Sequence, residues 1–158
     1  GLSLQQTTEQ LVKRCVEHLS LPIIAAGGIA TPDDVKHMKV LGASGVQVGS
    51  AYLLCKEAKT SALHQQAILE QAQDSTALTT LFSGRAARGI QNRVMLELGT
   101  MPEGVPSFPH ASSAITALRT CAEKAGQSDF SPLWCGQKYV PRVGVSAADI
   151  THILMKKW

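Results

Sequence analysis

Two short apolar segments, each ending in glycine, constrain the fold of this chain more than any other feature. Residues 21–26 (LPIIAA) lack polar alternation, which is typical of a parallel strand buried on both faces, and Gly27 and Gly28 end the segment. Residues 31–41 open with Thr-Pro-Asp-Asp, a typical helix start, and Gly42 is suited to the left-handed end. Residues 45–49 (GVQVG) predict a second short strand. This order predicts a right-handed βαβ unit with parallel strands, and therefore an α/β fold.

The segments around this unit are mostly helical in pattern. Residues 7–19 begin with a Thr7/Gln10 capping box and place five apolar residues on one face: Leu11, Val12, Cys15, Val16 and Leu19. Further helices are expected over residues 61–71, 112–126 and 146–157, and a short helical turn over 51–55. The chain is thus expected to alternate helices with few strands.

The region after residue 75 is less regular. Residues 76–82 are rich in threonine, which suits either a strand or an extended connection. Residues 83–93 (SGRAARGIQNR) are basic and interrupted by glycine, so the sequence predicts a structured loop there. Residues 132–137 are expected to form an aromatic turn in which Trp134 either packs or lines a pocket.

Composition excludes several classes of protein. Hydrophobic residues make up 44% of the 158 residues and charged residues 17%, which favours one globular domain over disorder. No apolar stretch approaches the roughly 20 residues of a membrane span, and no secretory signal opens the chain. A net charge of +3 with 4% aromatic residues argues against a nucleic-acid surface. Four cysteines without a Cys-x-x-Cys pair predict reduced thiols, no metal site and a cytoplasmic location.

The two glycine turns are the candidate ligand site. Glycines at the carboxyl ends of adjacent parallel strands leave backbone N–H groups accessible, an arrangement that suits a phosphate at Gly27, Gly28, Gly49 and Ser50. In (β/α)8 barrels a phosphate commonly binds between the loops after strands 7 and 8, beside a short extra helix such as residues 51–55. The alternative is that the glycines serve only tight turns that need positive φ.

Other polar residues have two interpretations each. Gln47 lies between Val46 and Val48 and either contacts a ligand or links neighbouring strands. The arginines at 85, 88 and 93 either neutralise an anion or pair with surface acids. The five histidines fall on predicted helices rather than at strand ends, where barrel catalysts lie, so none is predicted to be catalytic.

Four segments together resemble the nitronate monooxygenases, formerly called 2-nitropropane dioxygenases. They are residues 24–30 (IAAGGIA), 45–55 (GVQVGSAYLLC), 82–93 (FSGRAARGIQNR) and 133–137 (LWCGQ). The resemblance implies an FMN-dependent TIM (β/α)8 barrel enzyme that oxidises alkyl nitronates with O2 to a carbonyl compound and nitrite. It places Gly27 and Gly28 at the FMN phosphate turn after strand 7. It places Gln47, Val48, Gly49 and Ser50 at the turn after strand 8.

The length of the chain implies a fragment of such an enzyme, because a complete barrel takes about 250 residues. By resemblance, residues 1–75 are the last two βα units with the FMN phosphate turns. Residues 76–158 are a C-terminal loop and helical extension that is not an independent domain. The family's catalytic histidine belongs to an earlier part of the barrel, so no catalytic residue is predicted here. Gly1 in place of methionine fits a truncated product.

The expected partners are a small nitronate, O2 and either the missing N-terminal barrel segment or an oligomer partner. Two alternatives remain for the function. One is another FMN barrel oxidoreductase, such as an enoyl reductase, which shares the phosphate turns. The other is a non-catalytic truncated remnant.

Overall fold

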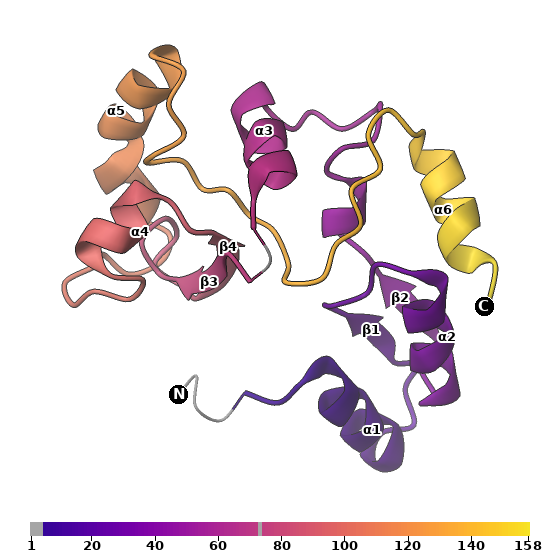
Figure 1. Ribbon diagram of the computed structural model, residues 1–158. Coiled ribbons are helices and arrows are strands. Elements are labelled where there is room, and N and C mark those ends of the chain that lie inside the picture. Colours follow the sequence, from indigo (N-terminus) through magenta and orange to yellow (C-terminus); the bar gives the residue numbers. More distant parts are fainter. Residues whose placement is uncertain (1–4, 73) are drawn as a thin grey trace. The chain divides into compact units, whose positions relative to one another are not determined.

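The chain forms two compact units, which are described separately (Figure 1). The computed structural model describes residues 5–72 and 74–158; Gly1, on which the expectation of truncation rests, lies outside them. Unit 1 comprises the chain up to residue 58 together with 138–158, and unit 2 comprises residues 59–137. The contacts therefore group residues 59–75 and 138–158 differently from the expected division after residue 75. That residues 76–158 are not an independent domain stays a prediction.

Unit 1 contains the predicted strand–helix–strand pattern, which confirms the α/β class. Its elements are α1 (Thr8–His18), β1 (Ile24–Ala26), α2 (Pro32–Val40), β2 (Gly45–Gln47), the 3-10 helix η2 (Ser50–Tyr52) and α6 (Ala147–Met155). β1 and β2 pair in parallel, from Ile24 opposite Gly45 to Ala26 opposite Gln47. In Figure 1, α2 lies beside both β2 and α6.

Capping residues mark the start of α1, which precedes β1, and of α2, which follows it. Thr7 and Gln10 form the predicted capping box at the start of α1. Thr31 and Asp34 form a second one at the start of α2, where the Thr31 hydroxyl accepts from the Asp34 N–H at 3.2 Å. Gly42 follows the last turn of α2 with φ +97°, as predicted for a left-handed helix end.

The core of unit 1 lies between α2, α6 and one side of the two strands. Val35 and Ile150 are fully buried there, next to Ala25. The prediction that β1 is buried on both faces is wrong, because Ile24 is 56% exposed. The predicted inner face of α1 is also only partly covered, since Val12 is buried but Leu11 is 52% exposed. Among the described residues β1 and β2 pair only with each other, so the other edge of each strand has no strand partner there.

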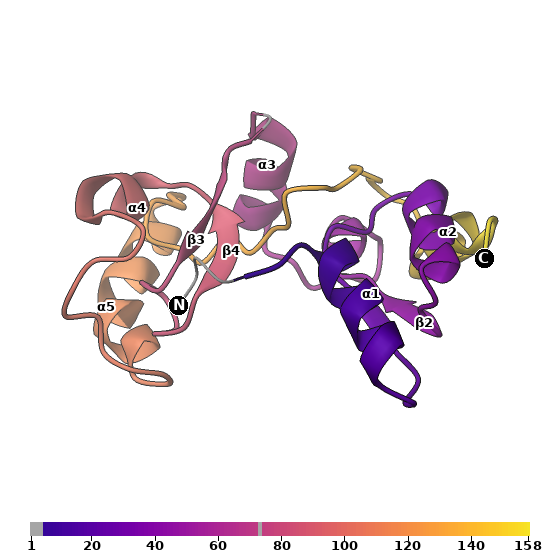
Figure 2. The ribbon, with the colours of Figure 1, turned by 90° about the horizontal axis from the view of Figure 1, so that it is seen from below.

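Unit 2 is built around a two-stranded antiparallel sheet. Its elements are α3 (Ala62–Glu70), β3 (Thr76–Thr79), β4 (Ala87–Ile90), α4 (Arg93–Leu98) and α5 (Ala111–Lys124). β3 and β4 pair from Thr76 opposite Ile90 to Thr79 opposite Ala87. Figures 1 and 2 both show this sheet between α3 on one side and α4 and α5 on the other. Within the described residues, no helix of either unit is long and apolar enough to cross a membrane.

The prediction of a loop over residues 83–93 is wrong for residues 87–90, which form β4, and for Arg93, which begins α4. This strand pairs with β3 on one edge and contacts residues 133–135 on the other. The Ile90 N–H donates to the Leu133 carbonyl at 2.8 Å, and the Cys135 N–H to the Arg88 carbonyl at 3.2 Å. Both edges of the strand depend on residues distant in sequence, so local strand propensity did not indicate it.

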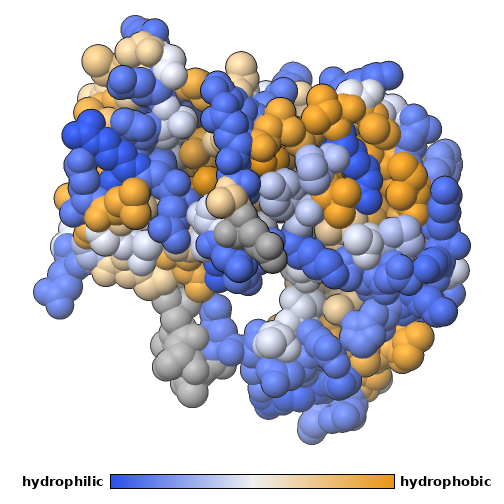
Figure 3. All heavy atoms as spheres, viewed as in Figure 1, coloured by the Kyte–Doolittle hydropathy of each residue, from blue (hydrophilic) through white to orange (hydrophobic). Residues whose placement is uncertain are grey.

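The core of unit 2 forms on the α4 side of this sheet. Phe82, Val94 and Met95 are buried there, and the Phe82 and Trp134 rings meet edge to face with centroids 5.6 Å apart. Trp134 therefore packs against the core, one of its two predicted roles. On the face shown in Figure 3, hydrophobic residues also reach the surface in several patches among hydrophilic ones.

The partial burial of a histidine is expected to make the stability of unit 2 depend on pH. His64 on α3 bonds through Nε2 to the Trp134 carbonyl at 3.1 Å. Partial burial lowers the pKa of His64, against the weaker opposite effect of this hydrogen bond. The unfolded chain therefore binds the proton more readily. The stabilisation present above the ordinary histidine pKa of about 6.5 is lost as the pH falls through that value toward the lower folded pKa.

We therefore expect the thermal midpoint of unit 2 to fall between about pH 7 and pH 5. His64→Gln, whose side chain does not titrate, is expected to reduce this fall. Trp134 fluorescence in a Trp158→Phe background follows unit 2 alone. An equal fall in midpoint for the histidine and glutamine proteins would contradict the assigned role of His64.

Candidate functional site

The two glycine turns meet at one end of the parallel sheet. Ala26 and Gln47 are the last paired residues of β1 and β2, so the turns that follow both start at the carboxyl end of the sheet. Gly27 and Gly28 have φ values of +101° and +72°. Gly49 precedes η2, whose first residue is Ser50. The structure thus brings Gly27, Gly28, Val48, Gly49 and Ser50 together at the carboxyl ends of the strands.

Two roles were predicted for these glycines: a tight turn that needs positive φ, and close approach of a ligand. The backbone angles and the space around each glycine distinguish the two. A Cβ added at Gly27 would lie 3.2 Å from the Thr8 hydroxyl, whereas one at Gly28 or Gly49 would meet no atom within 4 Å. The positive φ of Gly27 and Gly28 explains glycine there by backbone conformation alone. Gly49 has φ −114°, which any residue adopts, and open space where a side chain would lie. Neither the φ of Gly49 nor contact with the described residues explains glycine at this position, which leaves its backbone open to close approach by a ligand.

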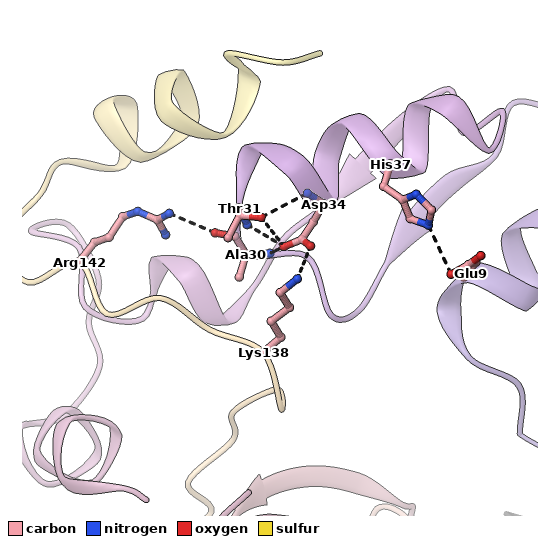
Figure 4. Close-up of polar contacts among 7 residues, drawn as sticks. All are labelled: Glu9, Ala30, Thr31, Asp34, His37, Lys138 and Arg142. Carbon is pink, nitrogen blue, oxygen red and sulfur yellow. Dashed lines mark hydrogen bonds and ion pairs between the residues drawn. The ribbon is translucent and has the colours of Figure 1, made fainter. Parts of the chain in front are cut away.

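The backbone N–H groups of the two residues just before α2, Ala30 and Thr31, already donate to a carboxylate of the chain. Asp34 accepts hydrogen bonds from the Ala30 and Thr31 N–H groups, both at 2.9 Å, through Oδ2 (Figure 4). The same oxygen accepts from the Thr31 hydroxyl at 2.8 Å. An anion at the turns would therefore meet the amides of the glycines rather than those of Ala30 and Thr31. The sequence indicated Asp34 only as an acid near the helix start.

Two cations from the C-terminal part of unit 1 reach the same turn. Lys138 forms an ion pair with Asp34, and Arg142 Nη2 donates to the Ala30 carbonyl at 3.1 Å (Figure 4). Burial alone would raise the pKa of Asp34, but the hydrogen bonds from Lys138, Ala30 and Thr31 hold that pKa below its usual value. Sequence reasoning missed both cations, because more than 100 residues separate them from the turn.

Gln47 differs from its predicted surroundings. The side chain was expected to be buried in an apolar strand, but Gln47 is exposed in this chain. Its position at the end of β2, next to the turn, agrees with the prediction. Its contact with a ligand stays a prediction. The short helical turn expected over 51–55 is η2, which begins one residue earlier and ends at Tyr52.

The three arginines considered for anion binding have other partners in unit 2. Arg85 stacks over Phe108, with its guanidinium carbon 4.4 Å from the ring centroid. Arg88 donates to the Thr76 carbonyl at 3.2 Å, and Arg93 pairs with Glu97 at 2.7 Å. Within the described part of the chain, no group of three His, Cys, Asp or Glu side chains is arranged to hold a metal ion.

Comparison with known proteins identifies the family of this chain. A sequence model of the family described as nitronate monooxygenase matches residues 2–157. The chain belongs to the nitronate monooxygenase family. A probable nitronate monooxygenase of Bacillus subtilis is 41% identical over 127 residues, which are 80% of this chain and 37% of that protein. The nitronate monooxygenase of Pseudomonas aeruginosa is 35% identical over 153 residues, 95% of this chain and 43% of that protein.

Solved structures agree with this membership. The nitroalkane oxidase from Streptomyces ansochromogenes matches with a TM-score of 0.84 and 28% identity, over 95% of this chain and 43% of that one. FabK from Thermotoga maritima, at 22% identity and a TM-score of 0.78, shares the fold over 97% of this chain and 49% of that one. This nitronate monooxygenase family member thus spans about two-fifths of the length of the curated relatives it matches.

Proposed function

We propose that this chain carries the phosphate end of an FMN site in a nitronate monooxygenase. The observation that carries the proposal is the pair of glycine turns at one end of a parallel strand pair, with open space at Gly28 and Gly49. A phosphate group needs several backbone N–H donors that point to one place, and adjacent glycine turns are suited to supply them. Family membership supports FMN as the ligand that carries this phosphate.

Each candidate residue has a role toward the cofactor. The backbone N–H groups of Gly27, Gly28, Gly49 and Ser50 hold the phosphate, and Val48 connects β2 to its turn. The exposed Gln47 side chain at the strand end binds polar atoms of the ribityl chain or the ring. Bound FMN supplies the redox centre for oxidation of the nitronate, and the protein groups orient it.

The reaction belongs to a larger assembly than this chain. Oxidation of an alkyl nitronate by O2 to a carbonyl compound and nitrite needs a complete active site, and no catalytic residue is assigned to these residues. Three apolar side chains near the unpaired edge of β1 are at least half exposed. Leu11 lies on α1, Leu19 follows α1, and Ile24 lies on β1 itself. We place the rest of a (β/α)8 barrel on this surface, which would pair the strand edge and cover the apolar side chains. Residues 1–75 then represent its last two βα units, in a cytoplasmic oxidoreductase.

A chimera tests this function. Residues 5–157 of this chain would replace the matching segment of the Pseudomonas aeruginosa relative, which is 35% identical to it. We expect the chimera to retain FMN through desalting, seen as its visible absorption, and to release nitrite from an alkyl nitronate with uptake of O2. The unaltered relative is the positive control.

Two results would contradict the proposal. A chimera that folds, as judged by circular dichroism, but retains no FMN would reject the cofactor site. A chimera that retains FMN but forms no nitrite would reject the nitronate activity and favour another FMN barrel oxidoreductase. The isolated 158-residue chain, tested in parallel for FMN retention, shows whether the two turns bind flavin without the rest of the barrel.

A further inference from the structure

The C-terminal part of unit 1 returns to the start of α2 and neutralises its acids. Lys138 pairs with Asp34, and Lys157 pairs with Asp33 at 2.6 Å. Arg142, which lies between the two lysines in sequence, donates to the Ala30 carbonyl. Figure 4 shows Lys138 and Arg142 approaching residues 30–34 from different sides. We refer to residues 138–142 as the strap.

The two acid pairs differ in their surroundings. The Asp33 side chain is 74% exposed and water screens its charge, whereas the Asp34 side chain is 15% exposed. Asp34 also holds the Ala30 and Thr31 amides, so its carboxylate cannot turn away from the glycine turn without breaking those bonds. An unpaired carboxylate would therefore remain fixed close to the candidate phosphate site.

The Asp34 carboxylate is held next to the glycine turn along the chain. It accepts from the Ala30 N–H at 2.9 Å, and the Cα atoms of Ala30 and Gly28 lie at most about 7.6 Å apart, two steps of about 3.8 Å. Charges act on one another over a screening length of about 8 Å at physiological ionic strength. A phosphate dianion at Gly28 would thus be repelled by Asp34 unless a cation neutralised that carboxylate. Among its contacts with described residues, Arg142 donates to the carbonyls of Ala30 and Val140, which leaves its own positive charge unneutralised by them.

We propose that Lys138 is a positioning residue for the phosphate of FMN, because it neutralises Asp34 and so lets the turn at residues 27–31 accept a dianion. Arg142 makes the net charge of the strap and Asp34 positive. This inference rests on the proposed FMN site and adds the residues that set its charge. It assigns no direct contact between Lys138 and the ligand.

Binding of FMN and of riboflavin to the same variants tests this role, because riboflavin lacks the phosphate. In the protein that binds FMN, chain or chimera, Lys138→Met is expected to raise the Kd for FMN about tenfold or more and to change the Kd for riboflavin less than about threefold. Lys138→Arg should restore FMN binding. Lys157→Met, which removes a lysine from the exposed pair at the same helix, is the matched control and should leave both constants unchanged.

A second substitution distinguishes neutralisation from direct contact. Asp34→Asn in the Lys138→Met background removes the unpaired charge and is expected to return the FMN Kd to within about threefold of the original. The pKa of Asp34, followed by carbon-13 NMR, should rise in Lys138→Met and fall back in Lys138→Arg. Circular dichroism and the thermal midpoint show whether each variant is folded.

Each contrary outcome has one meaning. Equal loss of FMN and riboflavin in Lys138→Met, or no recovery in the double variant, would overturn the role of Lys138 while the FMN site stands. Absence of FMN binding by both the unsubstituted chain and the chimera would overturn the proposed function and this inference with it.

Discussion

Replacing Gly49 with valine is expected to abolish FMN retention and leave the fold intact. Gly49 has a φ of −114°, outside the left-handed region, and a Cβ there would meet no atom within 4 Å, so we expect unit 1 to accommodate a larger side chain at this position. The new methyl groups would occupy the space that a phosphate needs beside the backbone. Loss of two charge-assisted hydrogen bonds, each worth about 1.5–3 kcal/mol, predicts at least a hundredfold weaker binding.

The measurement is FMN absorption after desalting of the chimera, together with circular dichroism. Gly49→Ala, which adds one carbon, is expected to give partial occupancy. Ala148→Val places a branched side chain on the exposed surface of α6 in the same unit and should retain FMN fully. Stoichiometric FMN in the Gly49→Val protein would reject this turn as the phosphate site.

Replacing Gly84 with alanine is expected to destabilise unit 2 more than the same substitution at Gly89, Gly99, Gly104 or Gly126. A Cβ at Gly84 would lie 2.5 Å from both the Phe108 nitrogen and the Pro106 carbonyl oxygen, which are backbone atoms and cannot rotate away. Gly84 also has φ +78°, which costs a residue with a Cβ about 1–2 kcal/mol. With about 1–3 kcal/mol for overpacking, we expect the free energy of unfolding to fall by about 2–5 kcal/mol.

Gly104→Ala is the matched control for this substitution. Gly104 has nearly the same φ, +81°, but a Cβ there would meet no atom within 4 Å, so only the backbone cost of about 1–2 kcal/mol applies. Urea unfolding followed by Trp134 fluorescence in the Trp158→Phe background gives both free energies. Equal losses of unfolding free energy in the two variants would show that the close approach of residues 106–108 to Gly84 does not contribute to the destabilisation.

Gly84 also explains part of the segment on which the family resemblance depends. In residues 82–93, Gly84 allows residues 106–108 to approach the backbone. On β4, Gly89 allows Leu133 to approach the backbone, because a Cβ at Gly89 would lie 3.0 Å from the Leu133 carbonyl oxygen. This segment is therefore explained by packing within unit 2, and its arginines by contacts there. The residues that identify the family need not be those that bind the ligand.

Local interactions made the elements of unit 1 predictable. Capping at Thr7 and Thr31 and the left-handed Gly42 depend on residues within a few positions of one another, so their pattern in sequence determines where α1 and α2 begin and where α2 ends. The same holds for the meeting of the two glycine turns, because consecutive parallel strands joined by one helix place their carboxyl ends at one edge.

Tertiary structure decided the rest, because it depends on partners that no local pattern specifies. β4 forms from a basic, glycine-rich segment since β3 and residues 133–135 supply its hydrogen bonds. Ile24 and Gln47 are exposed because burial of strand side chains depends on what covers each face of the sheet, and the core of unit 1 covers the face of Ala25 only. Lys138 and Arg142 reach residues 30–34 across more than 100 residues of sequence. The sequence by itself determined the elements of unit 1 and the glycine turns, whereas folding alone determined strand β4 and which charges surround those turns.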